Sequence, residues 1–404
     1  MAADTISTKL ALEAAARSEI DSFVVMDVMR AAADLEARGR SIVHMEVGQP
    51  ATPAPLAARE AAKRAIDGQT LGYTQALGTD ALRAAISQHY RETYGVDVPA
   101  RRVIVTTGSS AGFVLAFLAL FDAGDTVLLP SPGYPCYRHI LSALGCRPEL
   151  IETGPHNRWM PTAAYIAALA GGNISGGRGP VRGLLVASPS NPTGTMIEPE
   201  RLAALVTVCA ECGLWFVSDE IYHGLTFGRP VATALQYSDD AVIINSFSKY
   251  FSMTGWRIGW MIVPDRLVRT VERLAQNLFI SAPAISQAAA LGAFEARDEL
   301  DANVRAYAAN RELLLRELPL AGFTSIVPAD GAFYLYADVS DQLARHPGAT
   351  SRDLARRILE EAGVAVTPGV DFDTTRGGRF LRFSYAGSTA DMTEAARRLR
   401  AWGG

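Results

Sequence analysis

Short runs of Val, Ile and Leu alternate with helix-like segments through the middle of the 404-residue chain. The runs show no regular polar alternation, which is typical of strands buried on both faces of a sheet. Helical patterns such as Gly112–Phe121 and Glu198–Glu211 separate most of them. The alternation predicts an α/β fold with a mainly parallel sheet flanked by helices. The expected strands are Arg102–Thr107, Thr126–Pro130, Gly183–Ala187, Leu214–Ser218, Ala241–Asn245 and Gly259–Val263.

The pattern changes near Glu295, where a long helix rich in Ala, Arg, Glu and Leu is expected to Leu318. Short strands and further helices follow, which predicts a smaller α+β domain on which an N-terminal helix near Val24–Arg38 could pack. We therefore expect a large domain over residues 47–297 and a small domain from residues 1–46 and 298–404. The expected small-domain elements are strands Ala332–Tyr336, Val364–Thr367 and Phe380–Ser384 and helices Ser351–Ala362 and Ala390–Trp402. Gly171–Pro180 and Arg376–Gly378 are interpreted as glycine-rich loops.

Composition narrows the classes of partner. Hydrophobic residues make up 49% of the chain and the formal net charge is −4, so no basic surface for nucleic acid or anionic lipid is expected. The longest apolar run, near Ala111–Phe121, is too short to span a membrane, and the N-terminal residues lack a signal-peptide pattern. Four cysteines do not form a disulfide framework, and Cys209 and Cys212 fit ordinary packing better than redox or metal chemistry. A cytoplasmic protein without a metal is expected.

Lysine is rare in this sequence. Of the 38 basic residues only Lys9, Lys63 and Lys249 are lysines, so arginine occupies almost every cationic position. Lys249 alone stands in an apolar setting, after Ala241–Ile244. A partly buried lysine can lose its proton and form a Schiff base, which arginine cannot. Lys249 is therefore a candidate nucleophile.

A turn rich in glycine and serine, Gly108–Gly112, links an expected strand to an apolar helix. The hydroxyls of Ser109 and Ser110 lie beside the free N–H groups of a helix start, which is an arrangement that binds phosphate. The same letters spell G-x-S-x-G, the pattern of a nucleophile elbow. A serine hydrolase using Ser110 therefore remains an alternative, with His156, His223 and His346 as its available histidines, and so does a plain helix cap.

Polar side chains also follow three other expected strands. Asn191 stands in a proline-rich turn, Asp219 ends a buried strand with Tyr222 three residues on, and Lys249 and Arg257 are eight residues apart. Ligands of open α/β sheets bind beyond the carboxyl ends of the strands. A phosphate cradle, a carboxylate for a cation, an amine and a guanidinium together match pyridoxal phosphate, which has a phosphate, a protonatable nitrogen and an aldehyde.

At these residues the sequence resembles the class I/II aminotransferases, which are fold-type I pyridoxal-phosphate enzymes. The resemblance runs from about Ser22 to the C-terminus and rests on eight motifs in order. They are Val47–Pro50, Gly72–Thr74, Pro132–Pro135, Ser190–Gly194, Ser218–Tyr222, Ser246–Lys249, Gly255–Gly259 and Leu381–Ser384. It implies transfer of an amino group from an L-amino acid to a 2-oxo acid.

The resemblance also implies roles for single residues. Lys249 would hold the cofactor as an aldimine and shuttle the proton. Asp219 would pair with the pyridine nitrogen, so that the ring becomes a better electron sink. Asn191 and Tyr222 would hydrogen-bond the ring oxygen, and Tyr134 would stack on the ring.

The same resemblance assigns the phosphate and the substrate. Residues implied to hold the phosphate are Ser109, Ser110, Ala111, Ser246 and Arg257. Tyr73 would reach the phosphate of a neighbouring subunit, which implies a homodimer with shared active sites. Arg382 would bind the substrate α-carboxylate as a fork, with Asn191 nearby and Gly48 allowing close approach. No second cation for a distal carboxylate stands out; Arg158, Arg376 and Arg379 are candidates by position only.

Other functions remain open on the same scaffold. It also supports lyases, cyclases and decarboxylases, because fold does not fix chemistry. A catalytically silent ligand-sensing domain would need a DNA-binding module, for which the roughly 45 residues before Val47 are too few.

Overall fold

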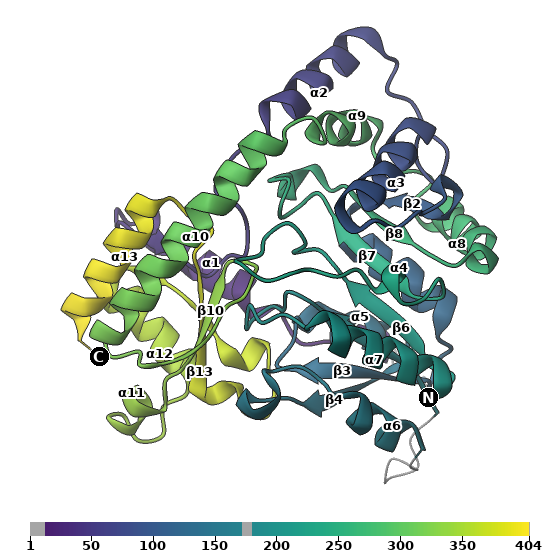
Figure 1. Cartoon of the computed structure of the whole chain (residues 1–404). Helices are drawn as coiled ribbons and strands as arrows, with labels where there is room; N and C mark the ends of the chain where they lie inside the picture. Colours follow the sequence, from purple (N-terminus) through teal and green to yellow (C-terminus); the bar gives the residue numbers. More distant parts are fainter. Residues whose placement is uncertain (1–12, 172–179, 404) are drawn as a thin grey trace, which may run out of the picture.

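The computed structural model of the chain describes residues 13–171 and 180–403. A seven-stranded sheet lies at its centre in the order β2-β8-β7-β6-β5-β3-β4 (Figure 1). The pairings from β7 to β4 are parallel, whereas β8 is antiparallel to both β7 and β2. The expectation of a mainly parallel sheet is confirmed. The strands are β2 Val103–Thr106, β3 Thr126–Ser131, β4 Arg147–Glu152, β5 Val181–Ala187, β6 Trp215–Asp219, β7 Val242–Ser246 and β8 Gly259–Ile262.

Strand β4 was not predicted from the sequence. It lies at the edge of the sheet and pairs only with β3 among the described strands. Three of its six residues are charged, so it lacks the continuous apolar run that marks the central strands.

Both faces of the sheet are covered, which explains the apolar runs. On β7, Ile243 packs into one hydrophobic core and Ile244 into another. Helices α2, α3, α7 and α9 contribute to the first core, and α4 and α8 contribute to the second. The helices are α2 Leu56–Gly68, α3 Asp80–Tyr94, α4 Gly108–Leu120, α5 Pro135–Ala143, α6 Ala163–Gly171, α7 Pro199–Glu211, α8 Asp265–Leu278 and α9 Ala284–Ala293.

A second, smaller group of elements lies beside this sheet (Figure 1). Its four-stranded antiparallel sheet has the order β12-β13-β10-β9, and a separate pair, β1 with β11, is parallel. A third hydrophobic core fills this unit. Its strands are β1 Val43–His44, β9 Ser325–Val327, β10 Tyr334–Asp338, β11 Val364–Ala365, β12 Thr367–Pro368 and β13 Phe380–Ser384. Its helices are α1 Val24–Glu36, α10 Arg297–Leu320, α11 Ser340–Ala344, α12 Ser351–Arg357 and α13 Thr389–Trp402.

Three sequence expectations for this unit differ from the structure. The expected strand Val364–Thr367 is divided between two sheets, as β11 and β12. Strand β10 begins two residues later than expected, after Ala332, whose φ of 57° is not extended. The expected helix Ser351–Ala362 changes to a π-helical turn at Ile358.

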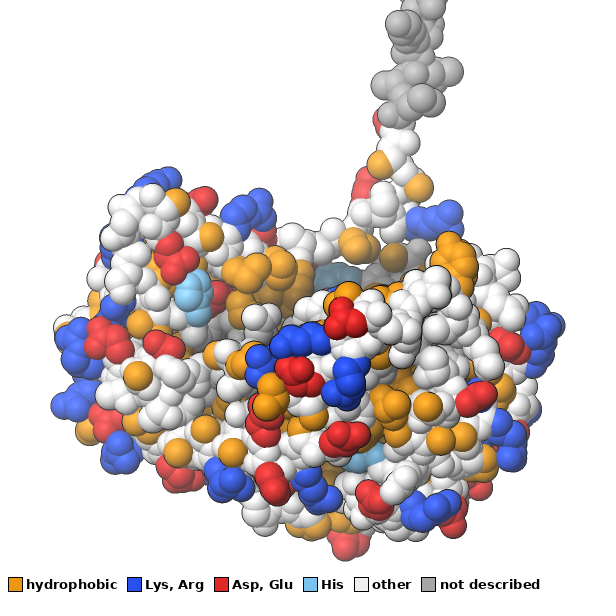
Figure 2. All heavy atoms as spheres, turned by 90° about the horizontal axis from the view of Figure 1, so that it is seen from above, with side chains coloured by type: hydrophobic (Ala, Val, Ile, Leu, Met, Phe, Trp, Pro, Cys, Tyr) orange, Lys and Arg blue, Asp and Glu red, His pale blue; other side chains and the backbone are white. Residues whose placement is uncertain are grey.

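Most of the glycine-rich stretch 171–180 lies outside the described residues, as does Lys9. Among the described residues, no helix combines the length and the apolar character needed to cross a bilayer. On the face shown in Figure 2, basic and acidic side chains are interspersed, and neither sign forms a large patch.

Candidate active site

A cavity of about 490 Å³ lies where the carboxyl ends of β5, β6 and β7 meet the start of α4. It brings together ten of the residues predicted from the sequence. They are Gly48, Ser109, Ser110, Tyr134, Asn191, Asp219, Tyr222, Lys249, Arg257 and Arg382. Parallel strands end at one edge of a sheet, so residues far apart in the sequence converge there.

The direction of β8 contributes to this convergence. Arg257 precedes β8, and Lys249 follows β7. Because the two strands are antiparallel, the start of β8 lies at the same sheet edge as the end of β7. The amine and the guanidinium therefore face one cavity.

Lys249 is half-buried, and its Nζ donates a hydrogen bond to the carbonyl oxygen of Gly48 at 2.6 Å. Burial lowers its pKa to about 8, and the positive charges of Arg382 and Arg257 add to this effect. A larger fraction of the amine is therefore unprotonated near neutral pH than in an exposed lysine. This is the state in which a lysine attacks an aldehyde carbon.

Asp219 is the last residue of β6 and only 3% exposed. One carboxylate oxygen accepts a hydrogen bond from the Tyr137 hydroxyl, and the other accepts one from the backbone N–H of Ile221 at 3.0 Å. Burial nevertheless raises its pKa to about 6. A buried carboxylate of this kind is stabilised by a cation placed beside it.

The start of α4 forms a cradle for an anion. Gly108 has a φ of +72°, and the Arg257 guanidinium packs so closely on it that a Cβ there would lie 2.5 Å from a guanidinium nitrogen. The backbone of Gly108 also packs against Gly259, where a Cβ would lie 3.1 Å away. Ser109 and Ser110 face the cavity from the first turn of α4. Free helix N–H groups, hydroxyls and a guanidinium are the donors that a phosphate needs.

Arg382 lies on β13 and is 2% exposed. It donates to Asn191 Oδ1 at 2.8 Å and to the carbonyl oxygen of Glu46. Its guanidinium lies between the rings of Tyr334 and Phe372, 4.4 and 4.7 Å from their centroids. Its Nε is buried without a hydrogen-bond acceptor. This orphaned donor in a fixed fork fits a carboxylate ligand.

Aromatic residues complete the cavity. The Tyr222 hydroxyl is 2.7 Å from that of Tyr334, and a Cβ at Gly48 would overlap the Tyr334 hydroxyl. Tyr134 meets the edge of Tyr137 at a centroid distance of 5.2 Å. The Tyr137 ring therefore supports the Tyr134 ring at the cavity wall.

Three predicted residues do not line this cavity. Ala111 is buried in α4, so its backbone but not its side chain could contribute. The Ser246 hydroxyl donates to the Ile258 carbonyl oxygen at 3.0 Å and lies 2.8 Å from Ser248 Oγ. Tyr73 is 85% exposed and is not among the residues that line this cavity.

Sequence reasoning missed other lining residues. Tyr137 and Tyr334 contact Asp219 and Tyr222, but both have the sequence signature of ordinary core aromatics. Helix α1 contributes an apolar wall that the sequence assigned only to domain packing. This α1 wall consists of Phe23, Val25 and Met26.

The candidate second cations are each paired with a carboxylate. Arg158 contacts Asp330 at 2.6 Å, Arg376 contacts Asp373 at 2.8 Å, and Arg379 contacts Asp338 at 3.2 Å. All three line a separate cavity of about 330 Å³. Lys249, Arg257 and Arg382 are the cationic side chains among the described residues that line the active-site cavity.

The two other sequence alternatives gain no support. His156, His223 and His346 do not line the cavity that contains Ser110, and the buried His223 ring is 2.8 Å from the Tyr94 hydroxyl. Burial raises the pKa of the Cys209 thiol to about 12, which makes it inert, and Cys212 is free and exposed. In the described part of the chain no group of three metal-ligating side chains occurs.

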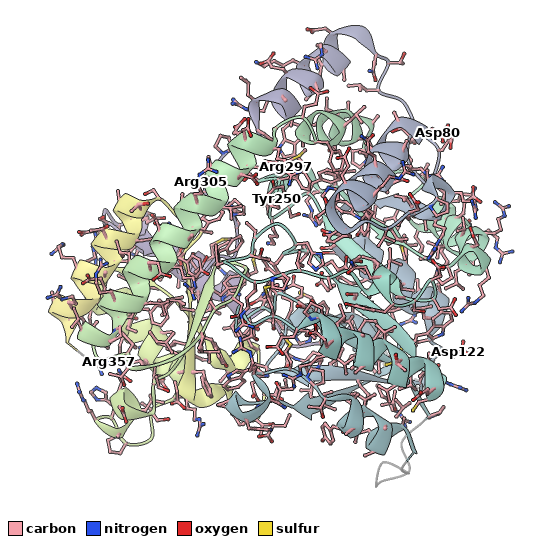
Figure 3. All side chains as sticks on the ribbon, in the orientation of Figure 1. Asp80, Asp122, Tyr250, Arg297, Arg305 and Arg357 are labelled. Atoms are coloured by element: carbon pink, nitrogen blue, oxygen red, sulfur yellow. The ribbon has the colours of Figure 1, made fainter. Side chains whose placement is uncertain are left out.

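Tyr250, the residue after Lys249, connects the site to the smaller unit. The Tyr250 hydroxyl donates to Asp301 on α10 at 2.7 Å. In Figure 3, Tyr250 is labelled close to Arg297, the first residue of α10. The residues that line the cavity together fit pyridoxal phosphate. They include an amine with a lowered pKa, a buried carboxylate that a cation would stabilise, and a group of hydrogen-bond donors that suits a phosphate.

Comparisons with known proteins agree with this geometry. The family model described as "Aminotransferase class I and II" matches residues 40–399. A curated valine–pyruvate aminotransferase of Mycobacterium tuberculosis is 48% identical over 394 residues, covering 96% of this chain and 98% of the relative. A (5-formylfuran-3-yl)methyl phosphate transaminase of Methanocaldococcus jannaschii is 34% identical, covering 94% and 96%.

Solved structures are similar over the same length. A crystal structure of an aminotransferase from Mycobacterium tuberculosis has a TM-score of 0.92 and 47% identity, covering 97% of this chain and 99% of that one. Aspartate aminotransferase from Thermus thermophilus with maleate has a TM-score of 0.87 and 29% identity, covering 97% and 100%.

Proposed function

Because the chain belongs to the class I and II aminotransferases, we propose that its amino donor is an L-amino acid with a small apolar side chain, such as valine, and that pyruvate is its acceptor. It is a pyridoxal-phosphate-dependent enzyme that moves an amino group between an amino acid and a 2-oxo acid. When bound, this cofactor supplies an electron sink and an aldehyde carbon that exchanges amino groups.

The observation that carries the proposal is the distribution of charge in the cavity. Three cationic side chains line it, and each has a role: Lys249 for the aldehyde, Arg257 for the phosphate and Arg382 for the α-carboxylate. No described cation is left over in this cavity for a carboxylate on the substrate side chain. The α1 wall supplies apolar surface instead. The name of the Mycobacterium tuberculosis relative points in the same direction.

We propose these roles for the chain's own residues. Lys249 holds the cofactor and moves the proton at the substrate Cα, and burial together with the neighbouring positive charges lowers its pKa. Asp219 keeps a positive charge on the ring nitrogen, with Tyr137 orienting the carboxylate. Asn191 and Tyr222 donate to the ring oxygen. Arg382 orients the substrate through its carboxylate.

The remaining roles concern the phosphate and the assembly. We propose that Ser109, Ser110, the Ala111 backbone and Ser246 join Arg257 at the phosphate.

We also propose a homodimer in which Tyr73 completes the neighbouring site, which its exposure and its absence from its own cavity support. The separate hydrophobic cores support a large domain of residues 47–297 and a small domain of residues 1–46 and 298–404. A cytoplasmic location is part of the same proposal.

The test uses the purified holoenzyme with a panel of amino donors. Valine and leucine are compared with aspartate and glutamate, all with pyruvate as the acceptor, and both products are quantified. Alanine is tested with 2-oxoglutarate instead, because alanine and pyruvate would only regenerate each other. We expect valine and pyruvate to give alanine and 2-oxoisovalerate in equal amounts. A preference for dicarboxylic donors would contradict the proposed substrate class. Donor without acceptor should stop after one turnover, whereas continued product release would indicate a lyase or decarboxylase.

A further inference from the structure

Helix α1 begins without a cap from its own sequence. Its N-cap residue, Phe23, makes no side-chain hydrogen bond to the helix, so the first backbone N–H groups need acceptors from elsewhere. Asp371, which is more than 340 residues away in the sequence, supplies these acceptors. Its two carboxylate oxygens accept from the N–H groups of Val24 and Val25, both at 3.3 Å.

Asp371 is 1% exposed, so its carboxylate has little contact with solvent. Two N–H donors and the positive end of a helix compensate for the lost hydration of a carboxylate. Asp371 itself does not line the active-site cavity. Its carboxylate therefore acts on the start of α1 and not on a ligand.

The backbone of the Asp371 turn is held by the segment that carries Tyr134. Arg138 donates to the carbonyl oxygen of Asp371 at 2.9 Å, and the N–H of Gly133 donates to the carbonyl oxygen of Phe372 at 3.0 Å. The Phe23 ring in turn meets the Tyr134 ring edge-on, with centroids 5.9 Å apart. The start of α1, the Asp371 turn and the Tyr134 segment thus form a closed set of contacts.

This closed set determines the position of the α1 wall. Phe23, Val25 and Met26 belong to the first turn of α1 or precede it directly, and all three line the cavity. The first turn of an uncapped helix frays. If it frayed here, the apolar surface that these residues add to the cavity would lose its fixed place.

We propose that Asp371 is a positioning residue for substrate specificity: by capping α1 it holds Phe23, Val25 and Met26 where the substrate side chain lies. The inference rests on the proposed function, since it assumes an apolar donor side chain. Binding of donors with larger apolar side chains depends on Asp371, and the proton transfer at Cα does not.

The test compares Asp371→Ala with Asp371→Asn, because asparagine keeps one of the two acceptor oxygens, whereas alanine keeps neither. Asp353→Ala is the matched control: Asp353 accepts from the Thr350 N–H at 3.0 Å and caps α12, which contributes no residue to the cavity. Steady-state kinetics are measured with alanine, valine and leucine, each with 2-oxoglutarate as the acceptor, because alanine with pyruvate gives no net reaction. Amide hydrogen exchange of residues 23–30 is measured in parallel without substrate.

In Asp371→Ala we expect about fivefold faster exchange at the start of α1, the factor for loss of one helix cap. We expect KM to rise about tenfold for valine and leucine and less than about twofold for alanine, with kcat within about twofold. Asp371→Asn, which keeps one acceptor, should fall between wild type and Asp371→Ala in exchange and in KM. Asp353→Ala should match wild type at this site.

Unchanged KM and exchange in Asp371→Ala would overturn the inference, and so would an equal fall of kcat for every donor. Asparagine exchanging as fast as alanine at the start of α1 would also overturn it, since the remaining acceptor oxygen would then contribute nothing to the cap. If Asp371→Ala does not fold, Phe23→Ala should reproduce the rise in KM for valine, and an unchanged KM there counts against the inference. A wild-type enzyme inactive with all three donors would refute the proposed substrate class, while the exchange data still decide whether Asp371 caps α1.

Discussion

Asp219→Asn should stabilise the cofactor-free protein while weakening its hold on the cofactor. The carboxylate is 3% exposed, and burial raises its pKa from 3.8 to about 6. Because the folded state binds the proton more tightly than the unfolded state, the charged form destabilises the fold. At 1.36 kcal/mol per pKa unit, this rise corresponds to about 3 kcal/mol. Asparagine removes the charge and can still accept from Ile221 and bond with Tyr137.

The sign of the effect gives a pH signature. Below pH 3.8 the carboxyl group is protonated in both states, so the two proteins should be about equally stable. The advantage of Asp219→Asn should grow as the pH rises from 3.8 to about 6 and then stay constant. The measurement is urea unfolding of the cofactor-free proteins at several pH values from 4.5 to 8.

A surface carboxylate provides the control. Asp265 pairs with Arg101, and this guanidinium lowers the pKa of the carboxyl group, so Asp265→Asn should lose stability instead of gaining it. With pyridoxal phosphate added, Asp219→Asn should retain it at least about tenfold less well, since a buried charge loses its counter-charge. Equal stability of wild type and Asp219→Asn at pH 8, or a gain that does not change with pH, would refute the argument.

Three further predictions follow from the contacts of Lys249, Gly48 and Arg382. The rate at which the cofactor-free protein takes up pyridoxal phosphate, followed by absorbance, should rise with pH and level off above about 8, the lowered pKa of Lys249. A rate that still rises at pH 10 would contradict this prediction. Lys249→Arg should show no covalent uptake. Gly48→Ala should cost about 1–3 kcal/mol in thermal unfolding and reduce activity, because the new methyl group overlaps the Tyr334 hydroxyl; an unchanged melting temperature would show that the ring moves freely. Arg382→Lys should raise the donor KM roughly tenfold or more with retained cofactor, because one ammonium cannot hold Asn191 and a carboxylate fork together; a fall in kcat alone would argue for another role.

The residues that sequence reasoning located best follow buried strands. Asn191, Asp219 and Lys249 come after β5, within β6 and after β7, and parallel strands bring their carboxyl ends together whatever the sequence separation. Arg257 needed one more fact, the antiparallel direction of β8. A signal for it existed, since the segment between Ser246 and Gly259 holds no α-helix and is too short for a parallel crossover.

Other features had no local signal. Tyr137 and Tyr334 have the same hydrophobic spacing as core residues, so only the fold shows that their hydroxyls reach the site. The cap that Asp371 places on α1 joins segments 346 residues apart, a pairing that no local sequence pattern contains. Strand β4 was not predicted because three of its six residues are charged, so it contains no continuous apolar run.

The scarcity of lysine has a chemical consequence for an enzyme that handles a free aldehyde. Outside the active site, Lys63 is the one other lysine among residues 13–171 and 180–403, and it is already paired with Glu60 at 2.7 Å. Arginine does not condense with aldehydes under mild conditions, so free pyridoxal phosphate meets few competing primary amines on the surface of this protein. Reagents that label primary amines should accordingly modify the native protein at very few places.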